Sequence, residues 1–181
     1  MAQLPSSHLR LADLSSREPT AFDLSPTAQE RAAVADALGI IGIRKLRFSG
    51  TLAPLGRSDW ELKGDIGATV VQACVVTLDP VATRIDEAVR RSYMADLPDV
   101  EANEIEMPED DTIEALPAAL DLAAVMIEAL ALALPPYPRA EGADLGETVY
   151  TEPGKQAMTD EQAKPFAGLA GLRDSLENKG D

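Results

Sequence analysis

Few side chains in this sequence have the types and the spacing that catalysis requires. The chain has one histidine, His8, and one cysteine, Cys74, and these two would have to meet for nucleophilic work. Cys74 falls on the apolar side of an alternating pattern, which is typical of a small buried hydrophobic residue rather than a nucleophile. His8 lies in a polar segment without neighbours that would make it a base or a ligand. We therefore expect no catalytic residue.

Cofactor and metal motifs are missing as well. The sequence contains no G-x-G-x-x-G or Walker-type phosphate loop, and its Cys, His and carboxylate residues do not fall at ligand spacing. Acid pairs such as Asp110 and Asp111 lie in a polar run, where no apolar wall would shift their pKa values for acid–base work. We expect no cofactor, no metal ion and no small-molecule substrate.

Charge is the strongest chemical feature of the chain. Its 181 residues include 31 acids and 16 bases, which give a formal net charge of −15. Such a field repels phosphate at long range and disfavours binding to nucleic acid or to an anionic membrane. The distribution is uneven, because residues 95–115 contain nine acids and no base, whereas residues 44–91 contain eight bases and six acids.

Two groups of charged residues are therefore candidates for binding a partner. A sheet edge carrying the basic group could meet phosphates, although such residues also keep an edge soluble. The acidic group could hold a basic partner, although runs of like charge are usually solvated. The basic group consists of Arg44, Lys45, Arg47, Arg90 and Arg91. The acidic group consists of Glu104, Glu106, Glu109, Asp110 and Asp111.

The element around which these groups must be arranged is an apolar helix at residues 121–134. Asp121 can cap its first turn, and Pro135 and Pro136 end it. The helix is apolar on all faces, which predicts burial on most sides. Glu128 is the one charged residue inside the helix, and we expect its carboxylate to face solvent through a gap. The alternative is a functional carboxylate, for which the sequence identifies no partner.

Period-two alternation predicts β-structure upstream of this helix. Even positions from Trp60 to Leu78 are mostly apolar or small, and odd positions are mostly polar, which indicates one buried and one wetter face. The run is too long for a typical strand. We therefore expect Gly64 and Gly67 to split it into two antiparallel strands.

Three further segments have regular patterns. Residues 40–48 alternate with one slip in phase, which predicts a strand with a bulge or two short strands. Residues 81–94 fit a helix or a strand, and a strand is favoured because the sheet needs another partner. Residues 25–39 indicate a helix, which Ser25 or a capping box of Thr27 and Glu30 can start and Gly39 can end.

The predicted fold class is α+β, with an antiparallel sheet that can curl toward a barrel and that packs against the buried helix near residues 121–134. The domain organisation follows from composition. Residues 1–24 form an N-terminal arm, residues 25–138 form a single core domain that includes the acidic segment 95–115, and residues 139–181 form a polar extension with a short docking motif at 165–173.

Three stretches resemble the YceD family, the large ribosomal RNA subunit accumulation proteins. Residues 74–80, CVVTLDP, stand in the place of a family segment that often reads Cys-x-x-Cys-Leu-x-Pro. The helix running into 132–138, LALPPYP, and the motif at 165–172, PFAGLAGL, follow in the family's order, so the resemblance covers about residues 25–173. Thr77 stands where many members have the second cysteine, so a metal or redox role of that pair is not implied here.

The resemblance implies a cytoplasmic bacterial protein that supports accumulation of large-subunit rRNA, without established catalytic residues. We expect a non-enzymatic ribosome-biogenesis factor that binds large-subunit rRNA through the basic group or a basic ribosomal protein through the acidic group. Net charge favours the second mechanism. The alternatives are a small enzyme acting on RNA or a small molecule, and a plain protein-interaction module whose acidic segment orders on binding. A membrane partner is not expected.

Overall fold

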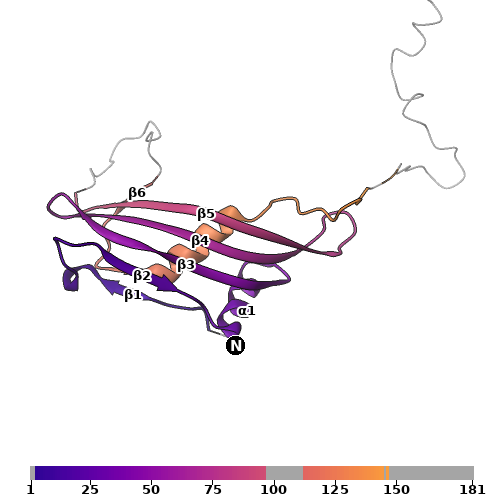
Figure 1. Ribbon diagram of the computed structural model, residues 1–181, viewed down its shortest axis with the longest axis horizontal. Helices are drawn as coiled ribbons and strands as arrows, with labels where there is room; N and C mark the ends of the chain where they lie inside the picture. The colour runs from indigo at the N-terminus through magenta and orange to yellow at the C-terminus, as the bar shows by residue number, and fades with distance from the viewer. Residues whose placement is uncertain (1–2, 97–111, 145, 147–181) are drawn as a thin grey trace, which may run out of the picture. The chain divides into compact units, whose positions relative to one another are not determined.

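The computed structural model describes residues 3–96, 112–144 and 146. The chain divides into two units, Met1–Ala143 and Asp144–Asp181, and all the elements below belong to the first. Within the described residues, a five-stranded sheet, a two-stranded sheet and two α-helices confirm the predicted α+β class (Figure 1). In chain order these elements are β1 (His8–Arg10), β2 (Thr20–Leu24), α1 (Ala28–Ala37), β3 (Gly42–Leu55), β4 (Asp59–Ala73), β5 (Pro80–Met94), β6 (Ile113–Ala115), β7 (Ala119–Asp121) and α2 (Leu122–Ala133).

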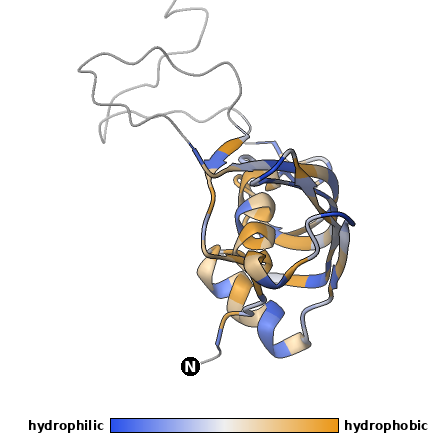
Figure 2. Cartoon of the chain, turned by 90° about the vertical axis from the view of Figure 1, so that its left-hand side faces the viewer, coloured by the Kyte–Doolittle hydropathy of each residue, from blue (hydrophilic) through white to orange (hydrophobic). Residues whose placement is uncertain are grey.

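The large sheet has the strand order β2-β3-β4-β5-β6. Its neighbouring strands are antiparallel except that β6 runs parallel to β5. A separate pair joins β1 to β7, also antiparallel. The large sheet curves around α2, so its concave face and the helix share one core (Figure 2). The sheet curls as expected but does not close into a barrel.

The core is built by the alternation along β4. Its even-numbered residues Trp60, Leu62, Ile66, Ala68 and Val70 are buried, as predicted. The helix α2 supplies three side chains that are almost entirely enclosed, Leu122, Met126 and Leu130. Burial of one side chain of this size contributes about 1.5–3 kcal/mol, so the contact between helix and sheet adds substantially to the stability of the unit.

The strand β4 is continuous, and the predicted break at Gly64 and Gly67 is wrong. Gly64 instead leaves room for the rings of Phe48 and Phe22, whose centroids lie 5.0 Å apart. A Cβ atom at Gly64 would lie 2.9 Å from Phe48 Cε2 and 3.2 Å from Phe22 Cζ. The glycine is therefore required by close packing across the sheet and not by a turn in its own strand.

The two neighbouring strand predictions are confirmed. In β3 the register with β4 shifts between Ile43 and Lys45, which is the predicted bulge. The segment 81–94 lies in β5, which pairs with β4 from Pro80 to Tyr93 without a register shift. The local pattern fitted a helix or a strand, and pairing with β4 makes the segment a strand.

The first helix, α1, starts at the predicted capping box rather than at Ser25. The Thr27 side chain accepts a hydrogen bond from Glu30 N, and the Glu30 carboxylate accepts one from Thr27 N at 2.7 Å. Gly39 follows the helix with a φ angle of 66°, the left-handed conformation expected there.

The second helix, α2, also starts where predicted but is less enclosed than its composition suggests. The Asp121 carboxylate caps it, accepting hydrogen bonds from Ala123 N at 3.0 Å and from Ser7 N at 2.8 Å. Leu132 is 75% exposed and Ala124 is also exposed. The sheet covers one side of the helix, so the apolar residues on the other side are not all buried.

The segment 1–24, which composition assigned to an arm, contributes two strands to this unit. β1 pairs with β7 immediately before α2, and β2 pairs with β3 along one edge of the large sheet. Leu11 lies between these two strands and is buried. The apolar side chains of this segment thus pack on the same core as the sheet.

Candidate functional site

The basic residues of β3 lie on an inner strand rather than at a sheet edge, because β2 and β4 flank it. Lys45 and Arg47 point away from the core, on the convex face. Arg47 donates two hydrogen bonds to Asp23 of β2, from Nε at 3.0 Å and from Nη2 at 2.6 Å, and these bonds lower the pKa of Asp23. Arg44 and Lys45 form no ion pair with another described residue.

Arg90 and Arg91 are successive residues of β5, so their side chains point to opposite faces. Arg90 lies on the convex face, where its Nη2 is 2.7 Å from Glu61 Oε1. Glu61 also pairs with Lys63, whose Nζ lies 2.7 Å from Oε2. The hydrogen bond from Lys63 is the largest of several effects that lower the pKa of Glu61. The basic residues here are already paired with a carboxylate.

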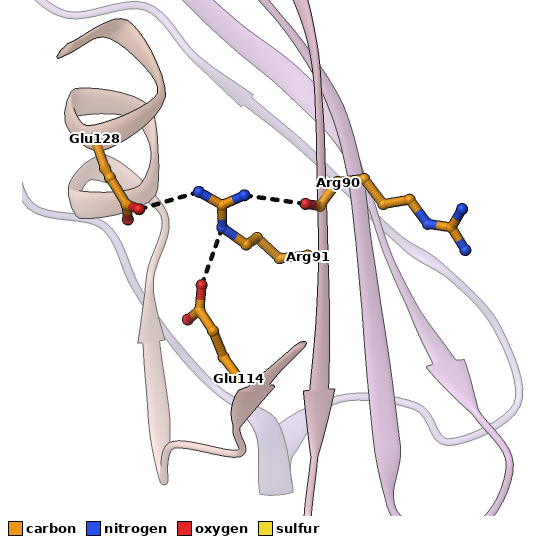
Figure 3. A network of polar contacts seen from close by, with 4 residues as sticks. All are labelled: Arg90, Arg91, Glu114 and Glu128. Carbon is orange, nitrogen blue, oxygen red and sulfur yellow. Dashed lines mark hydrogen bonds and ion pairs between the residues drawn. The ribbon is translucent and has the colours of Figure 1, made fainter. Parts of the chain in front are cut away.

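Arg91 connects three elements on the concave side (Figure 3). Its Nε lies 3.0 Å from Glu114 Oε1 on β6, its Nη2 lies 3.0 Å from Glu128 Oε1 on α2, and its Nη1 donates to the Arg90 carbonyl at 3.2 Å. The Arg91 side chain is 16% exposed. Glu128, expected to face solvent, is 55% exposed and has in Arg91 the partner that the sequence did not identify. Arg91 is therefore a structural link, with each guanidinium nitrogen engaged.

The convex face of the sheet is hollowed over β3, β4 and β5. This hollow has a volume of about 460 Å³ and is lined by charges of both signs, Lys45, Arg47, Arg84, Asp65 and Asp86 among them. Arg84 bonds Asp86 through two hydrogen bonds, which lower the pKa of Asp86. The hollow is mixed in charge, so it does not present a set of unpaired cations to a phosphate backbone.

A second groove, of about 410 Å³, lies between β5 and the C-terminal half of α2. We call it the β5–α2 groove. Its walls include Glu87, Val89 and Arg91 from the strand and Ala129, Leu132 and Ala133 from the helix. Sequence reasoning missed it, because its existence depends on which strand lies at the sheet edge. The apolar composition of α2 instead predicted that Leu132 would be covered.

Cys74 lies in the loop after β4 and is buried, as predicted, but its surroundings favour a thiolate. Its Sγ accepts hydrogen bonds from the backbone N–H groups of Val76 and Thr77, each at 3.4 Å, and of Ala140 at 3.3 Å. Bonds from the Thr77 side chain, then from the Ala140 and other amides, lower the pKa of Cys74 to about 6. The lowered pKa of Cys74 results from the conformation of the loop and not from a neighbouring base.

The loop after β4 also contacts the segment that follows α2. Val75 N donates to the Pro138 carbonyl at 2.9 Å, and Gln72 Nε2, near the end of β4 itself, donates to the Pro135 carbonyl at 3.1 Å. Two of the stretches that carry the family resemblance, 74–80 and 132–138, therefore meet in space although about sixty residues of chain separate them.

His8 lies at the opposite end of α2 from Cys74. Its Nε2 is 3.8 Å from Oδ2 of the capping residue Asp121, whereas Cys74 bonds Ala140, beyond the C-terminal end of the helix. The 12 residues of α2 span about 18 Å at the usual helical rise. The structure thus does not bring the histidine and the cysteine together as a nucleophile and its base.

Several predicted residues lie outside the described part of the chain. These are the acidic group, Glu104, Glu106, Glu109, Asp110 and Asp111, and the motif at 165–173. Among the residues that are described, no group of three or more His, Cys, Asp or Glu could hold a metal ion. In the same residues, no helix has the length and apolar character to cross a membrane.

A protein-family model matches more than half of the chain. The family model described as large ribosomal RNA subunit accumulation protein YceD matches residues 62–173, which include most of β4, all of β5, the described part of the acidic segment and α2. This match confirms the resemblance seen in the motifs. No curated protein and no solved structure matches the chain.

Proposed function

The chain belongs to the YceD family, and from this premise we propose that it is a non-enzymatic factor of large-subunit biogenesis that holds a basic ribosomal protein. The family's name implies a role in the accumulation of large-subunit rRNA. In the proposal the protein acts in the bacterial cytoplasm, and rRNA accumulates because a ribosomal protein that binds it is kept available for assembly.

The pairing of the basic residues carries this proposal. Each of five bases on β3, β4 and β5 bonds a carboxylate: Arg47, Lys63, Arg84, Arg90 and Arg91. Most of the basic group is thereby neutralised on the described surface. The whole chain keeps a net charge of −15, with nine acids in residues 95–115. A field of this sign attracts a cationic protein and repels an rRNA backbone.

Binding to separated ribosomal components tests the proposal. The immobilised full-length chain is offered either the proteins stripped from large ribosomal subunits by salt or protein-free large-subunit rRNA. We expect retention of one or a few basic proteins and no retention of rRNA at moderate salt. Recovery of naked rRNA without any ribosomal protein would reject the proposed mechanism.

Charge variants identify the surface responsible. Replacing the five residues of the acidic group by Gln or Asn should weaken retention about tenfold, because it removes much of the attractive field. The matched control is Arg44→Gln with Lys45→Gln, two bases whose side chains form no ion pair with a described residue. The control should bind equally well or better. Loss of binding in the control with full binding in the acidic-group variant would contradict the proposal.

A further inference from the structure

The outer edge of β5 is open along most of its length. β4 pairs with one side of β5 from Pro80 to Tyr93, whereas on the other side β6 pairs only with residues 92–94. No described strand pairs with that side of residues 80–91 (Figure 1). An open edge of this length presents a row of backbone groups that another chain can use.

The hydrogen bonds to β6 identify which backbone groups face this edge. Ser92 N donates to the Thr112 carbonyl, and the Met94 carbonyl accepts from Leu116 N. Even-numbered residues of β5 therefore direct their backbone groups away from β4. Because the register with β4 is regular, the same holds for the even-numbered residues from 82 to 90. These residues form the template for one more strand.

The β5–α2 groove runs beside this edge and combines an apolar wall with acidic side chains. Leu132 is 75% exposed and lines the groove with Ala129 and Ala133. Glu87 also lines it. Glu114 and Glu128 flank Arg91 at its side, with side chains 44% and 55% exposed. Arg90 also lines the groove, but its guanidinium is paired with Glu61. The three carboxylates of Glu87, Glu114 and Glu128 then outnumber the guanidinium of Arg91, so the remaining local charge is negative.

We propose that the β5–α2 groove receives an extended, positively charged segment of a partner protein, which adds to β5 as a further strand. Alternate side chains of the segment enter the groove, where apolar ones contact Leu132 and basic ones meet the carboxylates. A second copy of this chain fits less well, since each copy carries a net charge of −15. The inference rests on the proposed function, because it states how the basic partner is held.

Amide hydrogen exchange tests the strand addition directly. The probe is a blocked synthetic peptide of alternating lysine and valine, added to the full-length chain. In the free protein we expect rapid exchange at the even-numbered amides from 84 to 90 and slow exchange at their odd-numbered neighbours, which face β4. The peptide should slow the even-numbered amides about tenfold or more. Peptide binding that leaves these amides unprotected, or no binding, would overturn the proposal.

The peptide affinities of two variants and a control provide an independent test of the strand addition. Leu132→Ser removes the exposed apolar wall, and Ala88→Pro removes an N–H that faces the open edge without touching the ladder with β4. Each should lower peptide affinity at least about fivefold, because strand addition depends on both the wall and the row of donors. Ile41→Ser, at a residue 58% exposed just before β3, is the control and should leave affinity unchanged. Equal affinity in all four proteins would overturn the proposal.

These experiments also distinguish other occupants of the groove, and they separate failure of the groove proposal from failure of the proposed function. Protection of the even-numbered amides in the free protein would overturn the proposal. If that protection depends on protein concentration, a second copy of the chain occupies the edge of β5. If it does not, another part of the same chain occupies it. If Leu132→Ser and Ala88→Pro retain large-subunit proteins as well as the unmodified chain does, the groove proposal fails and the proposed function stands. Peptide protection without any retention of ribosomal protein overturns the proposed function alone.

Discussion

Cys74 is held in a loop that favours its charged form. Its folded pKa is about 6, whereas an unfolded thiol titrates at about 8.5. Between these values the folded chain has released a proton that the unfolded chain keeps. Stability should therefore rise with pH across this window and fall as pH drops through the folded pKa. The sequence placed Cys74 correctly in the core, but loop hydrogen bonds set its chemistry and have no periodic signature.

The first prediction concerns the Thr77 side chain, whose hydrogen bond is the largest cause of the lowered pKa of Cys74. Thr77→Val should raise the pKa of Cys74, because valine keeps the shape of threonine but lacks its hydroxyl. A pH titration followed by the ultraviolet absorbance of the thiolate measures this shift, and Cys74→Ser supplies the blank. Thr69→Val, on β4, is the matched control and should titrate like the unmodified protein. Identical midpoints in Thr77→Val and the control would show that the hydroxyl does not stabilise the thiolate.

The second prediction concerns the Arg91 network. Arg91→Met should lower the free energy of unfolding by roughly 1–2 kcal/mol, because it leaves two carboxylates without their shared partner. A double-mutant cycle with Glu128→Gln, measured by urea denaturation, should give a coupling below about 1 kcal/mol, because the Glu128 side chain is 55% exposed. A coupling of several kcal/mol would mean that the pair is more shielded from water than the structure indicates.

At the scale of elements, hydrophobic periodicity predicted the structure correctly where one strand or helix meets one large apolar surface. The alternation along β4 predicted its buried face, and the cap and double proline predicted the bounds of α2. Periodicity failed where the decisive neighbour is distant in sequence. Gly64 looked like a break because Phe22 and Phe48 could not be known to face it. The β5–α2 groove was missed for the same reason, since strand order is not a local property.

The third prediction tests the role of Gly64 as packing space. Gly64→Ala should destabilise the fold by about 1–3 kcal/mol, because its Cβ would lie 2.9 Å from Phe48 Cε2 and 3.0 Å from the Ser49 carbonyl. The control is Gly42→Ala in β3, where nothing lies within 4 Å of the added atom. Urea denaturation compares the two variants. Equal stability of both would contradict the packing argument and revive an explanation based on backbone freedom.

At the scale of the whole molecule, the excess of negative charge and the binding groove involve different parts of the chain. The net charge of −15 and the acidic run act at a distance, whereas the β5–α2 groove acts after contact. The bases on the described sheet are mostly bonded to carboxylates, so they add little to the external field. Attraction of a basic partner and its retention should therefore be separable by mutation.

The fourth prediction is that these two parts control different rate constants. Neutralising the five residues of the acidic group should slow association with the basic partner about tenfold and change dissociation little, because long-range attraction mainly increases the rate of encounter. Leu132→Ser should leave association unchanged and speed dissociation, because it removes a contact formed only in the complex. Surface-immobilised binding kinetics measures both, and raising the salt to about 0.5 M should abolish the difference in association. An acidic-group variant that changes dissociation alone would mean that these carboxylates touch the partner directly, and the separation of steering from holding would then be wrong.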